Sequence, residues 1–133
     1  GDARKPLWVK IAPDLEPAEL DEILAAIDAA GVDGIIIANT TLRRDGLVDP
    51  RRTETGGLSG RPLRERSAAL VAYVQRQTGG ALPIIGVGGV GSAADARAML
   101  DAGAAVVQLY TSMIYGGPGL AGRILRDLAA GGR

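Results

Sequence analysis

The sequence contains no cysteine and no histidine, and these two absences exclude several kinds of catalysis. Without cysteine there is no disulfide framework, no thiolate nucleophile and no thiolate-based metal site. Without histidine, neither a Ser-His-Asp triad nor the usual zinc sites can be built from this chain alone. We therefore expect no metal site, and any chemistry must use lysine, hydroxyl and amide side chains, carboxylates, backbone amides or a cofactor.

An excess of charge and a long apolar run are absent as well. Fifteen basic residues balance fifteen acidic ones, so no strong basic field favours binding to nucleic acid or to an anionic membrane surface. No apolar run approaches the roughly 18 residues that cross a bilayer, and the first residues resemble neither a signal peptide nor a lipidation motif. The 133 residues suit one domain, and because no initiator methionine is present we expect a processed or trimmed polypeptide.

What the sequence does contain is four short apolar runs rich in valine and isoleucine. Their apolar residues are continuous and do not alternate with polar ones, which is typical of strands covered on both faces in a parallel sheet. The predicted strands are Leu7–Ile11, Gly34–Ala38, Pro83–Val87 and Ala105–Leu109.

A helical pattern follows each predicted strand. The first lies between Pro17, which suits an initial helical turn, and Gly31, which suits a helix end. The second ends near Gly79, the third begins at a capping-box sequence, Ser92–Asp95, and we expect Pro118 to open the fourth. The apolar stripes comprise Leu20, Ile23, Leu24 and Ile27, then Leu63, Leu70, Val71 and Val74, then Met99 and Leu100, and last Leu120, Ile124 and Leu128.

The order of elements is therefore strand then helix, four times. Parallel strands joined by helical crossovers follow from this order, so the fold class is α/β, either a doubly wound sheet or part of a (β/α)8 barrel. A complete barrel needs roughly 250 residues, which makes four units about half of one. Half a barrel would leave two sheet edges and an apolar inner face uncovered, and a missing half, a second copy or further residues should cover them.

In such sheets, binding sites form at the carboxyl ends of the strands. Lys10 lies there within an otherwise apolar strand, where a charge is costly unless it meets an anion or reaches solvent. It is either a lysine that extends from an edge strand into water or a cation that faces an anionic ligand in the barrel mouth. Asn39 and Thr40, with Thr41, offer donors and acceptors for a small polar ring or a carboxylate, although such residues are equally common in loops and caps.

Two further features lie between and after the strands. The stretch from Leu42 to Arg61 is long for such a connection, which is typical of lids and binding loops, and its arginines, interspersed with acidic residues, predict a solvated surface. Its glycine-rich end, Gly56–Gly60, lets backbone N–H groups approach a ligand. The turns Gly86–Val90 and Leu109–Thr111 follow the last two strands, where barrels often bind phosphate, although tight helix–strand packing also explains paired glycines.

Five segments, taken in order, carry a resemblance to one family. They are Val-Lys-Ile-Ala-Pro-Asp-Leu at 9–15, Ala-Asn-Thr-Thr at 38–41, Thr-Gly-Gly-Leu-Ser-Gly-Arg-Pro-Leu at 55–63, Ile-Ile-Gly-Val-Gly-Gly-Val at 84–90 and Gln-Leu-Tyr-Thr at 108–111. Each is modest alone, but in this order and spacing they resemble the C-terminal half of dihydroorotate dehydrogenases over residues 5–128. The first and third segments are most similar to class 2, the membrane-associated, quinone-reducing enzymes.

The resemblance implies that residues 1–133 form the C-terminal half of an FMN-binding (β/α)8 barrel domain whose N-terminal half is absent. It implies an enzyme that uses FMN to oxidise dihydroorotate to orotate in pyrimidine biosynthesis, with a quinone as electron acceptor. Ala38 departs from the pattern, because relatives often carry threonine beside the flavin. The implied FMN contacts are Lys10 at the pyrimidine edge of the flavin, Ala38, Ser59 and Gly60, with Gly88, Gly89, Tyr110 and Thr111 at the phosphate, and the implied substrate contacts are Asn39 and Thr40.

The same resemblance places the general base in the missing half, so no catalytic residue is expected in this chain. Contacts to quinone and membrane would lie there too, with the full-length protein peripheral on the cytoplasmic side of the cell membrane and the fragment itself soluble. Two alternatives stay open: another FMN barrel oxidoreductase, and a non-catalytic half-barrel that associates with itself. We expect the isolated chain to lack activity, to bind FMN weakly or not at all, and to form dimers or larger assemblies.

Overall fold

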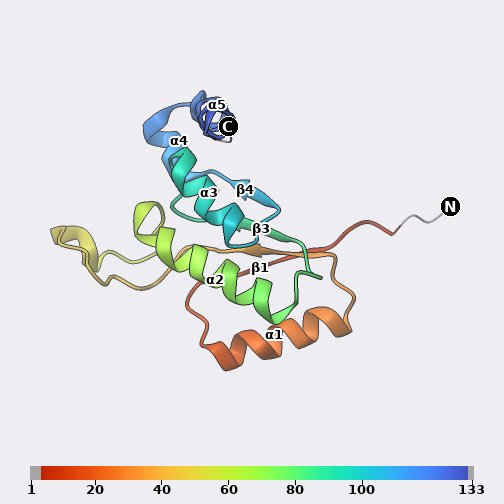
Figure 1. Cartoon of the computed structure of the whole chain (residues 1–133). Coiled ribbons are helices and arrows are strands. Elements are labelled where there is room, and N and C mark those ends of the chain that lie inside the picture. Colours follow the sequence, from red (N-terminus) through yellow and green to blue (C-terminus); the bar gives the residue numbers. More distant parts are fainter. Residues whose placement is uncertain (1–3, 132–133) are drawn as a thin grey trace.

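The computed structural model describes residues 4–131, in which strands and helices follow the predicted order (Figure 1). The strands are β1 (Trp8–Ile11), β2 (Gly34–Ile37), β3 (Ile84–Val87) and β4 (Val106–Gln108), and the helices that follow them are α1 (Pro17–Ala29), α2 (Arg64–Gln77), α3 (Ala93–Asp101) and α5 (Leu120–Ala130). A short helix α4 (Thr111–Gly116) precedes α5, and 3₁₀ turns at Pro50–Thr53 and Arg61–Leu63 precede α2. The four predicted strand-helix units are confirmed. In the part of the chain that the structure describes, no helix is long and apolar enough to span a membrane.

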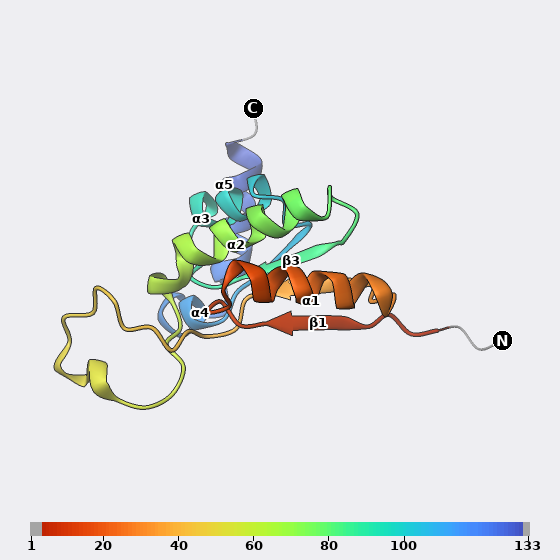
Figure 2. The same cartoon turned by 90° about the horizontal axis from the view of Figure 1, so that it is seen from below.

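The four strands form one parallel sheet in chain order, β1-β2-β3-β4. Ile36 of β2 stands beside Lys10 of β1 on one side and Ile85 of β3 on the other, so each strand pairs with its neighbours in the sequence. A doubly wound sheet would break this order at a switch point and carry helices on both faces. Here the helices cover one face of a sequentially ordered sheet, which is the arrangement of a partial (β/α) barrel (Figures 1 and 2).

The core lies between the sheet and its covering helices. Leu20 of α1, Val71 of α2 and Met99 of α3 are at most 2% exposed and belong to one cluster with Ile35 and Ile37 of β2. Full burial of each such side chain stabilises the fold by about 1.5–3 kcal/mol. Most of the residues in the predicted apolar stripes therefore lie on helix faces that cover the sheet. Leu100 is the exception: it is 38% exposed, because it follows the buried Met99 by one residue and so points about 100° away around the helix.

The opposite face of the sheet carries no helix within residues 4–131. Alternate strand residues point to it: Lys10 and Gln108 are exposed, and Val106 is 52% exposed. The Trp8 ring lies across Gly34, where an added Cβ would be 2.3 Å from the ring, so only glycine admits the indole there. This open face, together with the edge strands β1 and β4, matches the uncovered inner surface expected of a partial barrel.

Three details differ from the sequence predictions. The last helix begins at Leu120, because Pro118 lies in the turn before it. Helix α4 has no sequence signal, since none of its residues is buried and it therefore has no buried stripe. Ser92 caps α3 by accepting from the Asp95 N–H, but the Asp95 carboxylate accepts from the Gly91 N–H and not from that of Ser92, so only half of the capping box forms.

Candidate functional site

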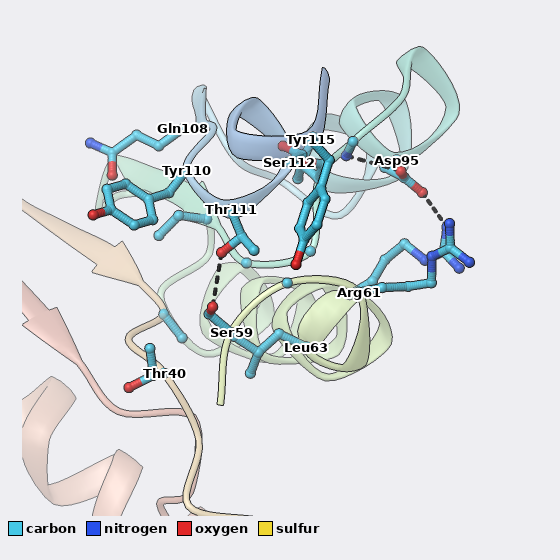
Figure 3. Close-up of a pocket in the computed structure, with 18 of the residues that line it drawn as sticks. Thr40, Ser59, Arg61, Leu63, Asp95, Gln108, Tyr110, Thr111, Ser112 and Tyr115 are labelled. Carbon is cyan, nitrogen blue, oxygen red and sulfur yellow. Dashed lines mark hydrogen bonds and ion pairs between the residues drawn. The ribbon is translucent and has the colours of Figure 1, made fainter. Parts of the chain in front are cut away.

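A cavity of about 760 Å³ opens at the carboxyl ends of the four strands (Figure 3). The turns after β3 and β4 form what we call the glycine-turn end, and residues of β1 and of the segment after β2 form the β1–β2 end. The ten residues predicted to contact cofactor or substrate all line this cavity: Lys10, Ala38, Asn39, Thr40, Ser59, Gly60, Gly88, Gly89, Tyr110 and Thr111. The structure thus brings the predicted residues together, while their individual roles stay predictions.

The turn after β3 is shaped by two glycines. Gly88 and Gly89 have φ values of 120° and 74°, in the region that favours glycine. A Cβ on Gly89 would lie 2.6 Å from the backbone nitrogen of Arg64, so the start of α2 packs directly on the turn. Within residues 4–131, the N–H groups of both glycines donate to no other part of the chain. They are therefore available to an anion that enters the cavity.

An ion pair joins α2 to α3 beside this turn. The Arg64 guanidinium donates to the Asp95 carboxylate at 2.6 Å, and the second Asp95 oxygen accepts from the Gly91 N–H at 3.1 Å. Burial raises the pKa of Asp95, but hydrogen bonds from Arg64 and Gly91 outweigh it, so the pKa is lowered overall. No local sequence pattern indicates this pair, because its partners are 31 residues apart.

Two hydroxyl contacts join the other turns around the cavity. Thr111 Oγ1, at the start of α4, donates to Ser59 Oγ at 2.9 Å and connects the end of the long loop to the turn after β4 (Figure 3). Ser112 Oγ donates to the Val90 carbonyl at 2.5 Å. Tyr110 lines the cavity with a side chain that is 78% exposed. The glycine-turn end is thus held by contacts from three helices.

The β1–β2 end of the cavity is open. Lys10 is exposed on the edge strand β1 and also lines the cavity, so both predicted environments of its ammonium group, water and a ligand, fit the fold. Asn39 and Thr40 are exposed directly after β2, and Asn39 Oδ1 accepts from the Thr40 N–H at 2.8 Å. Ala38 is only 3% exposed and has no polar side-chain group to offer a ligand.

A buried threonine closes the base of the long loop at this end. Thr41, 4% exposed, donates from Oγ1 to the Asp14 carboxylate at 2.5 Å, and the second Asp14 oxygen accepts from the Leu42 N–H at 2.7 Å. Burial raises the pKa of Asp14, but these hydrogen bonds and the nearby Arg66 outweigh it and lower the pKa overall. Thr41 also pairs with Leu58 in an antiparallel bridge, so the chain leaves β2 and returns to the same point.

The loop between these two residues extends away from the sheet (Figures 1 and 2). One of its arginines contradicts the predicted solvated surface: Arg44 is half-buried and donates to the carbonyls of Glu54 and Gly56. Backbone carbonyls that lack a strand partner need such donors, which explains the difference. Arg51 agrees with the prediction, because it is 78% exposed and pairs with Asp49 at the surface.

Sequence relatives cover almost the whole chain. The family model described as Dihydroorotate dehydrogenase matches residues 2–131. The proteins named "Dihydroorotate dehydrogenase (quinone)" from Brucella ovis and Brucella melitensis are each 54% identical over 127 residues, which are 95% of this chain and 35% of theirs. The chain therefore spans about a third of the length of these curated relatives.

Solved structures share the fold as well. The crystal structure of DHODH from Eimeria tenella in complex with ferulenol has a TM-score of 0.90 and 44% identity, over 94% of this chain and 33% of that one. A ligand-free structure of DHODH from the same organism has a TM-score of 0.89 and 42% identity, over 97% of this chain and 37% of that one. The chain therefore matches about a third of the length of each solved structure, as it does of the curated sequence relatives.

Proposed function

Because this chain belongs to the dihydroorotate dehydrogenase family, we propose that it is the C-terminal half of the barrel of a quinone-dependent dihydroorotate dehydrogenase. Such an enzyme oxidises dihydroorotate to orotate in pyrimidine biosynthesis. The observation that carries the proposal is that one cavity at the carboxyl ends of the strands gathers these residues. Every residue that the family motifs assign to cofactor or substrate lines it, at the end of the barrel where active sites form.

The proposed cofactor is FMN, and the two ends of the cavity have groups that fit it. The available N–H donors of Gly88 and Gly89 suit a phosphate, with further donors in the turn after β4. Lys10 lines the other end, where its ammonium group would stabilise negative charge on the pyrimidine edge of the flavin. When bound, FMN would supply the electron acceptor for the oxidation. The end of the long loop, at Ser59 and Gly60, would contact the cofactor between these groups.

Asn39 and Thr40 are proposed to bind the substrate. They line the cavity beside Lys10, and the Asn39 amide offers the donors and acceptors that a pyrimidine ring requires. Proton removal also needs a base, and we assign it to the part of the enzyme outside this chain. The three serines that line the cavity are consistent with this assignment, since the hydroxyls of Ser59, Ser92 and Ser112 each form a hydrogen bond within the chain.

The rest of the enzyme is proposed to cover the open face of the sheet. It would also supply the contacts to quinone and to the cytoplasmic side of the membrane. The open face favours a second candidate function as well, because Val106 is half-exposed there and both sheet edges are free within residues 4–131. A second copy of the chain that covers this face would make a non-catalytic half-barrel assembly.

The test compares the full-length protein with the isolated chain. The full-length protein should show a flavin absorption spectrum and bind orotate in preference to uracil, whereas another FMN barrel oxidoreductase would not discriminate against uracil in this way. The isolated chain should give negligible dihydroorotate-dependent dye reduction and little bound FMN. Substantial dye reduction by the isolated chain would contradict the proposed division of the site, and a stable monomer in light scattering would contradict the self-associating alternative.

A further inference from the structure

The ion pair between Arg64 and Asp95 lies where α2 and α3 meet the turn after β3. Arg64 opens α2, and its backbone lies so close to Gly89 that an added Cβ would be 2.6 Å away. Asp95 lies in the first turn of α3 and accepts from the Gly91 N–H at 3.1 Å. The pair, closed at 2.6 Å, therefore ties both helices to opposite sides of the same turn.

The charges of the pair matter because both residues line the cavity. The Asp95 side chain is only 10% exposed, and an unpaired carboxylate there would repel a phosphate group. Arg64 offsets that charge, and its guanidinium donates to the Asp95 carboxylate at 2.6 Å. The geometry thus fits a supporting contact better than a phosphate-binding side chain.

The turn itself offers backbone donors, and backbone donors bind only when their direction is fixed. Residues 88–91 contain three glycines, which alone would leave the turn with many conformations. Ser112 donates to the Val90 carbonyl at 2.5 Å and Asp95 accepts from the Gly91 N–H, whereas the N–H groups of Gly88 and Gly89, which line the cavity, have no acceptor within residues 4–131. Without the ion pair, the Asp95 carboxylate would no longer be held in place to accept from the Gly91 N–H, and the turn would become more mobile.

From this arrangement we infer that Arg64 and Asp95 are positioning residues that set the preference of the site for a phosphorylated flavin over the same flavin without its phosphate. The inference rests on the proposed function, since it takes the glycine turn as the phosphate site. In this role neither residue contacts the ligand, because both act by fixing the backbone of the turn.

The test measures the affinity of FMN and of riboflavin, which lacks the phosphate, for the flavin-free full-length protein by fluorescence titration. In Asp95→Asn and in Arg64→Met, the dissociation constant of FMN should rise about tenfold, while that of riboflavin stays the same. The double variant should be no weaker than either single variant, because both changes break one contact. Asp101→Asn, an exposed carboxylate on the same helix, is the matched control and should change neither constant.

Other outcomes separate the explanations. If the role were electrostatic alone, Asp95→Asn would bind FMN more tightly, and the inference would be wrong. Equal weakening of FMN and riboflavin would reduce the pair to a general structural contact and also overturn it. If the unchanged protein prefers FMN and every variant keeps that preference, only this inference fails. If the unchanged protein shows no preference, the proposed phosphate site fails and the inference with it.

A second variant covers the case in which one substitution prevents folding. Arg64→Lys keeps the positive charge but loses the planar fork that aligns guanidinium with carboxylate. It should fold, as checked by circular dichroism, and still lose several-fold of the preference for FMN. An unchanged ratio of the two affinities in this folded variant would contradict the inference.

Discussion

The two ends of the cavity differ in how completely this chain builds them. At the glycine-turn end, side chains from three helices fix the backbone, through Arg64 with Asp95 and through Ser112 with Val90. At the β1–β2 end, Lys10, Asn39 and Thr40 are exposed. The difference teaches that contacts within this chain fix the backbone at one end of the cavity, whereas the other end has few such contacts among residues 4–131.

This comparison separates two kinds of residue. Residues at the glycine-turn end contribute to folding and to ligand geometry together, because their contacts lie within the chain. Exposed residues at the β1–β2 end contribute little to folding, since surface side chains rarely change stability by more than about 0.5 kcal/mol. Substitutions at the glycine-turn end should therefore lower stability, whereas substitutions of exposed residues at the β1–β2 end should lower activity and leave stability unchanged.

The largest effect is expected at the glycine turn. Gly89→Ala should lower the free energy of unfolding by about 3 kcal/mol or more, because its Cβ would clash with the Arg64 backbone at a positive φ. Gly46→Ala is the matched control: its φ of 76° is similar, but nothing lies within 4 Å of the added Cβ. Gly46→Ala should lower the free energy of unfolding by about 1 kcal/mol. Urea denaturation measures both, and equal costs would show that the glycine-turn end is less rigid than described.

The next effect concerns activity at the open end. Lys10→Met in the full-length protein should reduce dihydroorotate oxidation by about 100-fold, the loss typical of removing one group that stabilises developing charge. Its free energy of unfolding should change by less than about 0.5 kcal/mol, because the side chain is exposed. Lys5→Met, another exposed lysine near the start of the chain, should leave turnover unchanged. A large loss of stability in Lys10→Met would break the contrast between the two ends.

A smaller effect is expected for the hydrogen bonds of Asp14 at the β1–β2 end. Asp14→Asn should destabilise the fold by about 1–2 kcal/mol at pH 7, since Thr41 and Leu42 lose a charged acceptor. The pKa of Asp14 is lowered below its ordinary 3.8, so its stabilisation is full above that pH and is lost as the pH falls through the lower folded value. Urea titrations between pH 7 and pH 3 should show the two proteins converging in acid, whereas a constant difference would exclude the charge as the cause.

The smallest effect belongs to the extended loop. Asp49→Asn should leave the thermal unfolding midpoint unchanged, because the Asp49–Arg51 pair is exposed at the surface and is screened by salt. A fall as large as that of Asp14→Asn would mean that the loop contributes to the fold and is not peripheral to it. Thermal scans by circular dichroism at low and high salt distinguish these results.

The fold could be read from the sequence because its signals are local. Each strand is a short continuous apolar run, and helices such as Leu20–Ile27 repeat their apolar residues at the helical period. The position of the site followed from the rule that loops at the carboxyl ends of parallel strands converge, which is why Lys10 and Tyr110 line one cavity although they are far apart in sequence.

The remaining features depend on contacts between distant residues, and no local pattern encodes them. Asp95 was visible only as a helix cap, and its pairing with Arg64 is decided by how α2 and α3 pack. Asp14 and Thr41 meet across 27 residues for the same reason. Arg44 was expected in water because its neighbours are charged, but the loop folds back and offers it carbonyls.

The antiparallel bridge between Thr41 and Leu58 has a consequence for how this protein can vary in length. Since the chain departs and rejoins at one point, residues 42–57 are a side branch that the path from β2 to α2 does not need. Lengthening such a loop changes the free energy of loop closure little, by about 0.6 kcal/mol for each doubling of the loop length. A change in the length of residues 42–57 should therefore leave the pairing of β2 with its neighbouring strands unaltered.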